Sequence, residues 1–121
     1  MKKILLIEDD PFLVDIYSTR LKDSGLSVEV ATDGQAGLRK LKENKFDLLV
    51  LDIVLPHING WQILREIEKD ERLQNLKIFV FSNLGQKEEV KKGLKMGVIK
   101  YFIKAHFTPK EIVEEIKKAL K

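Results

Sequence analysis

The chain has 121 residues, a formal net charge of +3 and an apolar fraction of 44%, values that fit one globular domain with a single core. It contains no cysteine, so disulfides and thiol chemistry are excluded. No apolar run approaches the ~18 residues of a membrane span, and the run at residues 4–7 is too short for a signal peptide. The cytoplasm of a prokaryote is therefore the default location, and no membrane partner is expected.

Positive charge is concentrated toward the end of the chain. Residues 1–76 contain 11 basic and 14 acidic side chains, whereas residues 77–121 contain 11 basic and 5 acidic ones. A basic half can bind nucleic acid, but a solvated lysine surface is the more common explanation. We therefore expect no direct DNA binding.

Apolar, β-branched runs alternate with amphipathic segments along the whole chain. The apolar runs predict strands at residues 3–7, 27–31, 47–51, 76–81 and 98–103. The amphipathic segments predict helices at residues 11–24, 60–70, 86–96 and 109–120, with a further helix that begins at residues 32–34. Strict alternation of five strands with five helices predicts an α/β fold, a doubly wound five-stranded parallel sheet with helices on both faces.

The first predicted helix has a clear apolar face. Leu13, Tyr17 and Leu21 recur every four residues, and Phe12 and Ile16 lie beside them on the helical projection. We expect this face to pack on the sheet.

Polar side chains follow four of the five predicted strands. They are Glu8, Asp9 and Asp10 after the first strand, Asp52 after the third, Ser82 and Asn83 after the fourth, and Lys104 after the fifth. In doubly wound sheets the active groups gather outside the carboxyl ends of the strands, where the strand order switches. A single acid after a strand is most often a helix cap, and a single lysine there is most often a solvated loop residue. Together these residues bring carboxylates, a hydroxyl and an ammonium group to one edge of the sheet.

Carboxylates that lie within a few ångströms repel one another, so the cluster is hard to explain as a structural feature. It is, however, the ligand set of a hard divalent cation, and Mg²⁺ typically takes one or two carboxylates, waters and a phosphate. An ammonium and a hydroxyl opposite the metal complete an electrostatic clamp for a phosphoryl group in transfer. The pattern therefore predicts metal-assisted phosphoryl transfer.

These motifs resemble those of the response-regulator receiver family of two-component signal transduction, over essentially the whole chain. They stand here as Glu8-Asp9, as Asp52-Ile53-Val54-Leu55-Pro56 with Gly60 four residues further on, as Ser82 and as Lys104. The resemblance implies a flavodoxin-like fold in which Asp52 is phosphorylated, Asp9 binds Mg²⁺ directly and Glu8 binds it through water. It also implies that the backbone carbonyl of Val54 is a metal ligand and that Lys104 contacts the phosphoryl oxygens. Ser82 and the aromatic Tyr101 would form the switch that reports the phosphoryl group.

The resemblance implies a signalling receiver that promotes only its own aspartyl phosphorylation and dephosphorylation, and is otherwise not an enzyme. Its donor would be a histidine kinase or a histidine phosphotransfer protein. We expect residues 1–121 to form one receiver domain with no output domain after residue 121, as in single-domain chemotaxis or phosphorelay regulators; an excised receiver is the alternative. Output would then pass through residues 86–120 to a downstream protein or to a second copy in a homodimer.

The sequence departs from the family pattern at several positions around the site. Ala105 replaces the proline that follows the family lysine in a cis peptide, so we expect a trans Lys104–Ala105 bond. Asn83 stands where the family has a small residue and can narrow access to Asp52. Apolar Val54 and Leu84 stand where polar groups often flank the attacking water. Ile99-Lys100 replaces an acidic pair and adds to the basic surface.

Three other functions compete with the receiver interpretation. A phosphohydrolase with an aspartyl nucleophile commonly has a second acid two residues later, but that position is Val54 here. A flavin or nucleotide carrier needs a phosphate-binding loop after the first strand, where the acids of this chain would repel phosphate. A receiver that works without phosphorylation, as a plain interaction module, is the third.

Further polar and aromatic residues near the site are given structural roles. His57 and His106 are expected to be exposed loop residues, and Trp61 is expected to be a packing or surface residue. Lysines in the fourth helix are expected to form a solvated face.

Overall fold

The computed structural model describes all residues, 1–121, and has the α/β architecture that the sequence predicts. The strands are β1 (Lys3–Ile7), β2 (Ser27–Ala31), β3 (Leu48–Leu51), β4 (Lys77–Ser82) and β5 (Lys100–Ile103). The helices are α1 (Pro11–Asp23), α2 (Gly34–Glu43), α3 (Gly60–Lys69), α4 (Lys87–Lys95) and α5 (Pro109–Ala119), with 3₁₀ turns at Glu71–Leu73 and Lys104–His106. All five strands are parallel, in the order β2-β1-β3-β4-β5. The strand order reverses between β1 and β3, so the predicted flavodoxin-like, doubly wound sheet is confirmed.

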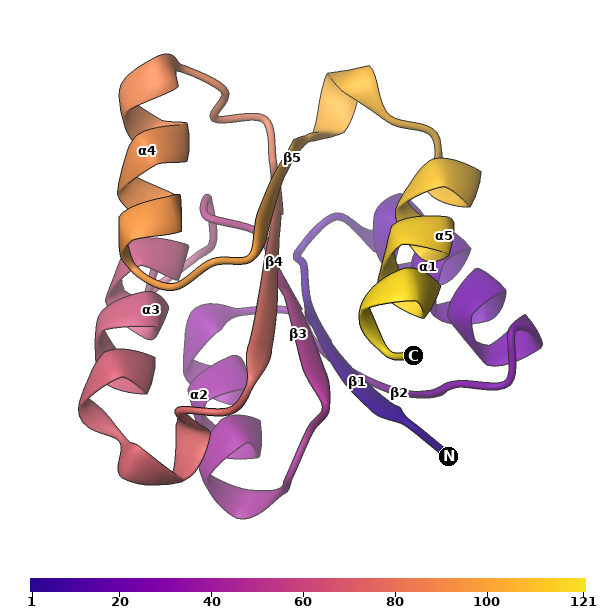
Figure 1. Cartoon of the computed structure of the whole chain (residues 1–121), viewed down its shortest axis with the longest axis horizontal. Coiled ribbons are helices and arrows are strands. Elements are labelled where there is room, and N and C mark those ends of the chain that lie inside the picture. Colours follow the sequence, from indigo (N-terminus) through magenta and orange to yellow (C-terminus); the bar gives the residue numbers. More distant parts are fainter.

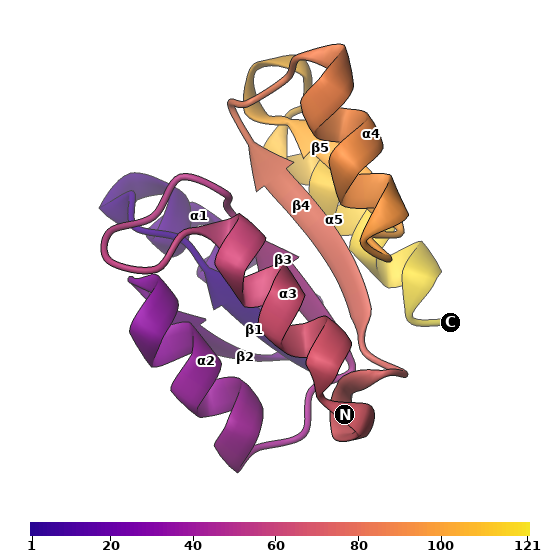
Figure 2. The same cartoon turned by 90° about the vertical axis from the view of Figure 1, so that its left-hand side faces the viewer.

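Helices cover both faces of the sheet. Helices α1 and α5 pack together on one face, and α2, α3 and α4 lie on the other (Figure 1; Figure 2). The core consequently has two halves, one of 14 and one of 12 buried residues, separated by the sheet. The central strands β1 and β3 are almost wholly buried because both their faces are covered, which explains their continuous apolar sequence. None of the helices is both long and apolar enough to cross a lipid bilayer.

Local side-chain bonds fix where several helices begin. The Asp10 carboxylate accepts a hydrogen bond from the Phe12 amide at the start of α1, and Pro11 occupies the first helical position. Thr108 and Glu111 form a capping box at the start of α5. Asp10 therefore acts as a helix cap, the most common role for an acid after a strand.

The apolar face of α1 is narrower than the sequence suggests. Tyr17 and Leu21 are buried and Leu13 is partly buried, but Phe12 is 80% exposed and Ile16 is 40% exposed. Phe12 and Ile16 therefore lie beside the packed face and are not part of it. Neighbouring residues on a helix point about 100° apart, so these two side chains turn past the edge of the surface that the sheet and α5 cover.

Strands β1 and β2 have the predicted bounds, and the other elements differ from the prediction at one or both ends. The largest difference is in β5, which begins at Lys100 rather than at residue 98. The Val98 amide still bonds back to the Gly93 carbonyl at the end of α4, and the Ile99 amide makes the first bond to β4, at the Ile78 carbonyl. The remaining ends agree to within one residue or so, the usual uncertainty of helix and strand boundaries.

Candidate functional site

Three carboxylates meet at the carboxyl ends of β1 and β3. Glu8 and Asp9 directly follow β1, and Asp52 directly follows β3. One ligand oxygen from each lies within 4.8 Å of the others. Glu8 is 1% exposed and Asp52 is 4% exposed, whereas Asp9 faces solvent. The predicted acidic cluster therefore forms at the switch in strand order, and Asp10 lies outside it as the α1 cap.

Lys104 supplies the positive charge of the site. Its Nζ lies 2.7 Å from Glu8 Oε1 and 2.9 Å from Asp52 Oδ2, and its side chain is only 13% exposed. The bond to Asp52 has hydrogen-bond geometry, but Glu8 Oε1 is buried without a hydrogen-bond partner although the ammonium is close. One ammonium thus faces two buried carboxylates, with Asp9 adding further negative charge.

Burial and charge act in opposite directions on these groups. Burial raises the pKa of Glu8, because the contact with Lys104 and the Asp10 amide offset only part of the desolvation. Burial alone would lower the pKa of Lys104, but its contacts with Glu8 and Asp52 raise it above the ordinary value. The lysine therefore remains charged, and its single ammonium group faces a cluster of three carboxyl groups.

A close backbone contact supports the loop after Asp52. The Gly60 amide donates a hydrogen bond of 2.8 Å to the Ile53 carbonyl at the start of α3. A Cβ on Gly60 would lie 2.7 Å from Ile53 Cα and 2.8 Å from the Asp52 carbonyl oxygen. Only glycine lets α3 begin this close to the site, which gives a physical reason for the Gly60 of the motif.

The two expected switch residues both bind the backbone of Leu84. Ser82 ends β4 and is fully buried, and its Oγ accepts a hydrogen bond of 3.3 Å from the Leu84 amide. The Tyr101 hydroxyl donates a 2.5 Å hydrogen bond to the Leu84 carbonyl. Ser82 and Tyr101 are therefore coupled through one peptide segment.

Val54 lies two residues after Asp52. Its amide donates a hydrogen bond of 3.3 Å to Asp52 Oδ1, and the residue is 58% exposed.

A sequence model described as the response regulator receiver domain matches residues 4–117. The chain belongs to this family. Receiver domains of two-component systems are signalling modules that are phosphorylated on an aspartate, and the family binds Mg²⁺ at an acidic pocket.

Known relatives and structures agree with this assignment. Over its full length this receiver domain is 30% identical to the DNA-binding dual master transcriptional regulator RpaA of Synechocystis sp., of which it covers 50%. The chain spans about half the length of the curated relatives that it matches. A CheY-like receiver domain protein from Methanospirillum hungatei is 30% identical with a TM-score of 0.88, over 99% of this chain and 94% of that one. The response regulator TrrA of Thermotoga maritima, in complex with Mg²⁺-BeF, is 27% identical with a TM-score of 0.83, over 98% and 99%.

Two aromatic contacts of the receiver domain were not expected from the sequence. The Nζ of Lys104 lies 5.5 Å from the centroid of the Phe81 ring, and the Nζ of Lys92 lies 4.4 Å from the centroid of the Trp61 ring. Phe81 looks like an ordinary core residue in an apolar strand, and its position directly before Ser82 is the only sequence signal that could have singled it out. Trp61 is half-buried against the core beneath α3, in line with the expected packing role.

The loop residues near the site lie as the sequence predicts. His57 and His106 are exposed, as expected, although His106 lies in the 3₁₀ turn after β5. The Lys104–Ala105 peptide is trans, as expected. Asn83 is exposed beside the site.

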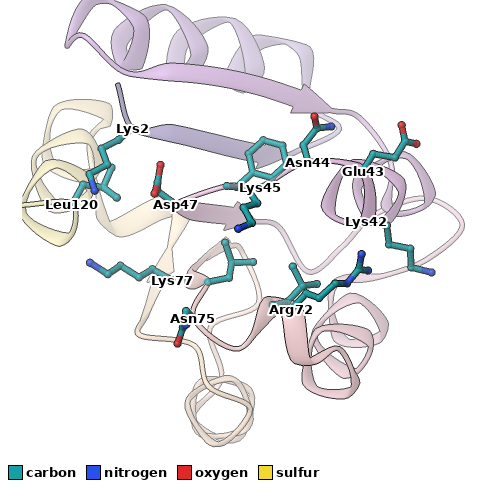
Figure 3. Close-up of a pocket in the computed structure, with 13 residues that line it drawn as sticks. Lys2, Lys42, Glu43, Asn44, Lys45, Asp47, Arg72, Asn75, Lys77 and Leu120 are labelled. Carbon is teal, nitrogen blue, oxygen red and sulfur yellow. The ribbon is translucent and has the colours of Figure 1, made fainter.

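A basic cleft lies at the opposite end of the sheet. It has a volume of about 740 Å³ (Figure 3). Its lining comes from Lys2 before β1, from residues 42–47 between α2 and β3, from the segment 72–77 that leads into β4, and from Leu120 after α5. Two of its cations are already engaged, Arg72 by Asp70 and Lys77 by the Ala119 carbonyl. None of the acidic-cluster residues lines it. The acidic cluster and this cleft are therefore separate sites.

Proposed function

We propose that this receiver domain, residues 1–121, accepts a phosphoryl group on Asp52. The observation that carries the proposal is the position of the Lys104 ammonium, 2.9 Å from Asp52 Oδ2 in a largely buried site. An Asp52 oxygen would bond to phosphorus as the bond from phosphorus to the donor breaks. Lys104 would then stabilise the charge on the phosphoryl oxygens, and burial makes such an interaction stronger than it is in water.

The acidic cluster fits a divalent cation. Its three carboxylates come within 4.8 Å of one another, and the one cation close to them is the Lys104 ammonium, which contacts Glu8 and Asp52. Glu8, Asp9, Asp52 and the backbone carbonyl of Val54 are the groups that would hold Mg²⁺. A bound Mg²⁺ would supply positive charge against the carboxylates and the phosphoryl oxygens.

The backbone of Leu84 is the proposed start of the signal. A phosphoryl oxygen on Asp52 would attract the Ser82 hydroxyl, which now accepts a hydrogen bond from the Leu84 amide. Tyr101 would move with the same segment, because its hydroxyl is bonded to the Leu84 carbonyl. The responding surface would consist of α4, β5 and α5, within residues 86–120.

The proposed donor is a histidine kinase or a histidine phosphotransfer protein. The α4-β5-α5 surface has charges of both signs, including an ion pair between Lys100 and Glu115. Such a surface suits a downstream protein with an acidic patch or a symmetric homodimer. The chemical turnover of the domain would be limited to gain and loss of its own phosphoryl group.

Intact-mass analysis with acetyl phosphate tests the acceptor. With Mg²⁺ the wild type should gain a single phosphoryl group, and without Mg²⁺ it should gain far less. Asp52→Asn is the matched control, because it keeps the shape of the side chain and removes the nucleophilic oxygen. Phosphorylation of Asp52→Asn to the extent of the wild type would refute the assignment.

Beryllofluoride, which stands in for the phosphoryl group, tests the signalling route. Backbone amide shifts should appear at residues 83–85 and then across α4, β5 and α5. Shifts confined to the immediate neighbours of Asp52 would show that the route through Leu84 is wrong.

A further inference from the structure

Phe81 forms the aromatic side of the pocket that holds Lys104. It is 3% exposed, next to the end of β4, and its ring centroid lies 5.5 Å from the Lys104 Nζ. That distance is within the roughly 6 Å range in which the negative face of an aromatic ring attracts an ammonium group. The lysine is 13% exposed, so water weakens this attraction only slightly.

The Phe81 ring is itself held in place from α1. The Tyr17 ring packs edge-on against it, with centroids 5.0 Å apart and an interplanar angle of 64°. Tyr17 is 2% exposed and belongs to the buried face of α1. Tyr17, Phe81 and Lys104 thus form a continuous series of contacts that runs from α1, across the end of β4, to the site.

We propose that Phe81 is a positioning residue that holds the Lys104 ammonium toward Asp52 during phosphoryl transfer. The proposal rests on the proposed function, because it presumes that Lys104 acts on a phosphoryl group at Asp52. It adds a contact that the acidic and hydroxyl residues of the site do not provide.

Lys104 needs a further contact because both of its ionic partners, Asp52 and Glu8, change their state in the proposed reaction. Asp52 becomes the phosphoryl carrier, and Glu8 belongs to the set of residues assigned to the metal. The Phe81 ring takes part in neither change, so its contact with the ammonium persists while the ionic contacts are exchanged. The contact with Phe81 would therefore keep the ammonium oriented while Asp52 is phosphorylated and Glu8 is engaged with the metal.

Phe79 provides a matched control on the same strand. It lies two residues earlier and faces the same half of the core, and it is 1% exposed. Its ring packs on Phe102 at 5.4 Å and has no cation over it. Phe81→Leu and Phe79→Leu therefore remove the same group from similarly buried positions, but only the first removes a contact with Lys104.

The rate of phosphorylation by acetyl phosphate with Mg²⁺ is the first measurement. Phe81→Leu should react about tenfold more slowly than the wild type, the rate equivalent of a partly desolvated cation–π contact, whereas Phe79→Leu should stay within about twofold. Thermal unfolding of both variants checks that they lose similar stability. Equal rates for the two variants would overturn the proposal.

A double-mutant cycle separates positioning from general packing. In a Lys104→Met background, Phe81→Leu should cause no further loss of rate, because the group that it positions is gone. A further loss of the same size as in the wild type would show that Phe81 acts through packing alone. Absence of phosphorylation in the wild type itself would instead refute the proposed function.

NMR of the unmodified protein tests the geometry without any substitution. The ε-methylene protons of Lys104 should be shifted upfield by the ring current of Phe81. Shifts at the values of a solvated lysine would overturn the proposal, even if Phe81→Leu does not fold.

Discussion

Replacing Lys104 with methionine would leave two buried carboxylates without their cation. Methionine has a similar length and shape, so Lys104→Met removes the charge with little change in packing. The ammonium that it removes lies 2.7 Å from Glu8 and 2.9 Å from Asp52, whose side chains are 2% and 5% exposed. We therefore expect a large loss of stability in the protein without metal.

Protonation sets an upper limit on the part of the loss that comes from the Glu8 charge. Removing one partner of a buried ion pair typically costs about 3–5 kcal/mol. The protein can avoid this cost by protonating Glu8, whose ordinary pKa is 4.5, at about 1.36 kcal/mol for each pH unit above that value. For the Glu8 charge alone, the limit is therefore about 4 kcal/mol at about pH 7.5 and about 1.4 kcal/mol at about pH 5.5.

The direction of the pH dependence follows from the pKa of Glu8. Burial already raises this pKa in the wild type, and loss of Lys104 raises it further. A carboxyl whose pKa is raised in the folded state contributes stability that is complete below its unfolded value of 4.5 and is lost as pH rises through the folded value. The stability difference between wild type and variant should therefore increase with pH.

Urea unfolding in EDTA at the two pH values measures the effect. The matched control is Lys100→Met at the start of β5, where the lysine side chain is 48% exposed and its ion pair with Glu115 is at the surface. The control should show a small loss that is the same at both pH values. If Lys104→Met also lost the same stability at both, the argument from buried carboxylates would be refuted.

Two further predictions concern charge and burial. Asp9→Asn should raise the melting temperature in EDTA because it removes an exposed, unpaired member of the acidic cluster, and Mg²⁺ should then stabilise it less than the wild type; equal Mg²⁺ shifts would contradict a shared metal site. Burial raises the pKa of Tyr17 and of Tyr101 to about 12, so the stability that each contributes is complete below pH 10 and is lost as pH rises through about 12. Ultraviolet titration should show no tyrosine ionising near pH 10 while the protein is folded.

The positions of the acids and the lysine could be predicted because they depend on topology. Parallel strands bring their carboxyl ends to one edge of the sheet, so the residues that follow β1, β3 and β5 share that edge. Strand β4 lies between β3 and β5, and the long Lys104 side chain spans this gap to reach Asp52. Strand spacing alone could not separate Asp10 from Glu8 and Asp9, because the three are consecutive acids; only the family resemblance singled out Glu8 and Asp9. The difference lies in the backbone, where Asp10 takes the capping conformation and bonds to the Phe12 amide.

Side-chain surroundings could not be predicted in the same way. The exposure of Phe12 depends on how far α5 and the sheet reach around α1, and the residues that decide it are distant in sequence. For Phe81 the burial could be predicted, but the neighbouring residue could not. Its apolar strand predicts burial, which is correct, but burial does not reveal that the neighbour over its ring is the Lys104 ammonium.

The lifetime of the phosphorylated state should depend on Val54. Hydrolysis requires a water held in line with the bond between phosphorus and the Asp52 oxygen, and orientation is a large part of such a barrier. Val54 lies two residues after Asp52, donates its amide to Asp52 Oδ1, and has a side chain that is 58% exposed at the mouth of the site. Its side chain can exclude water but cannot position it, since it has no hydrogen-bonding group. We therefore expect a long-lived phosphoryl group, suited to a sustained response.

Two substitutions at Val54 distinguish positioning from exclusion of water. After phosphorylation and removal of the donor, Val54→Asn should lose its phosphoryl group several times faster than the wild type, as followed by intact mass. Val54→Ala removes bulk and adds no hydrogen-bonding group, so it should speed the loss much less. Leu84 is a poorer test position, because its side chain packs against the core and its backbone holds Ser82 and Tyr101. If Val54→Ala matched Val54→Asn, Val54 would act by blocking access, and slower loss in Val54→Asn would reverse the argument.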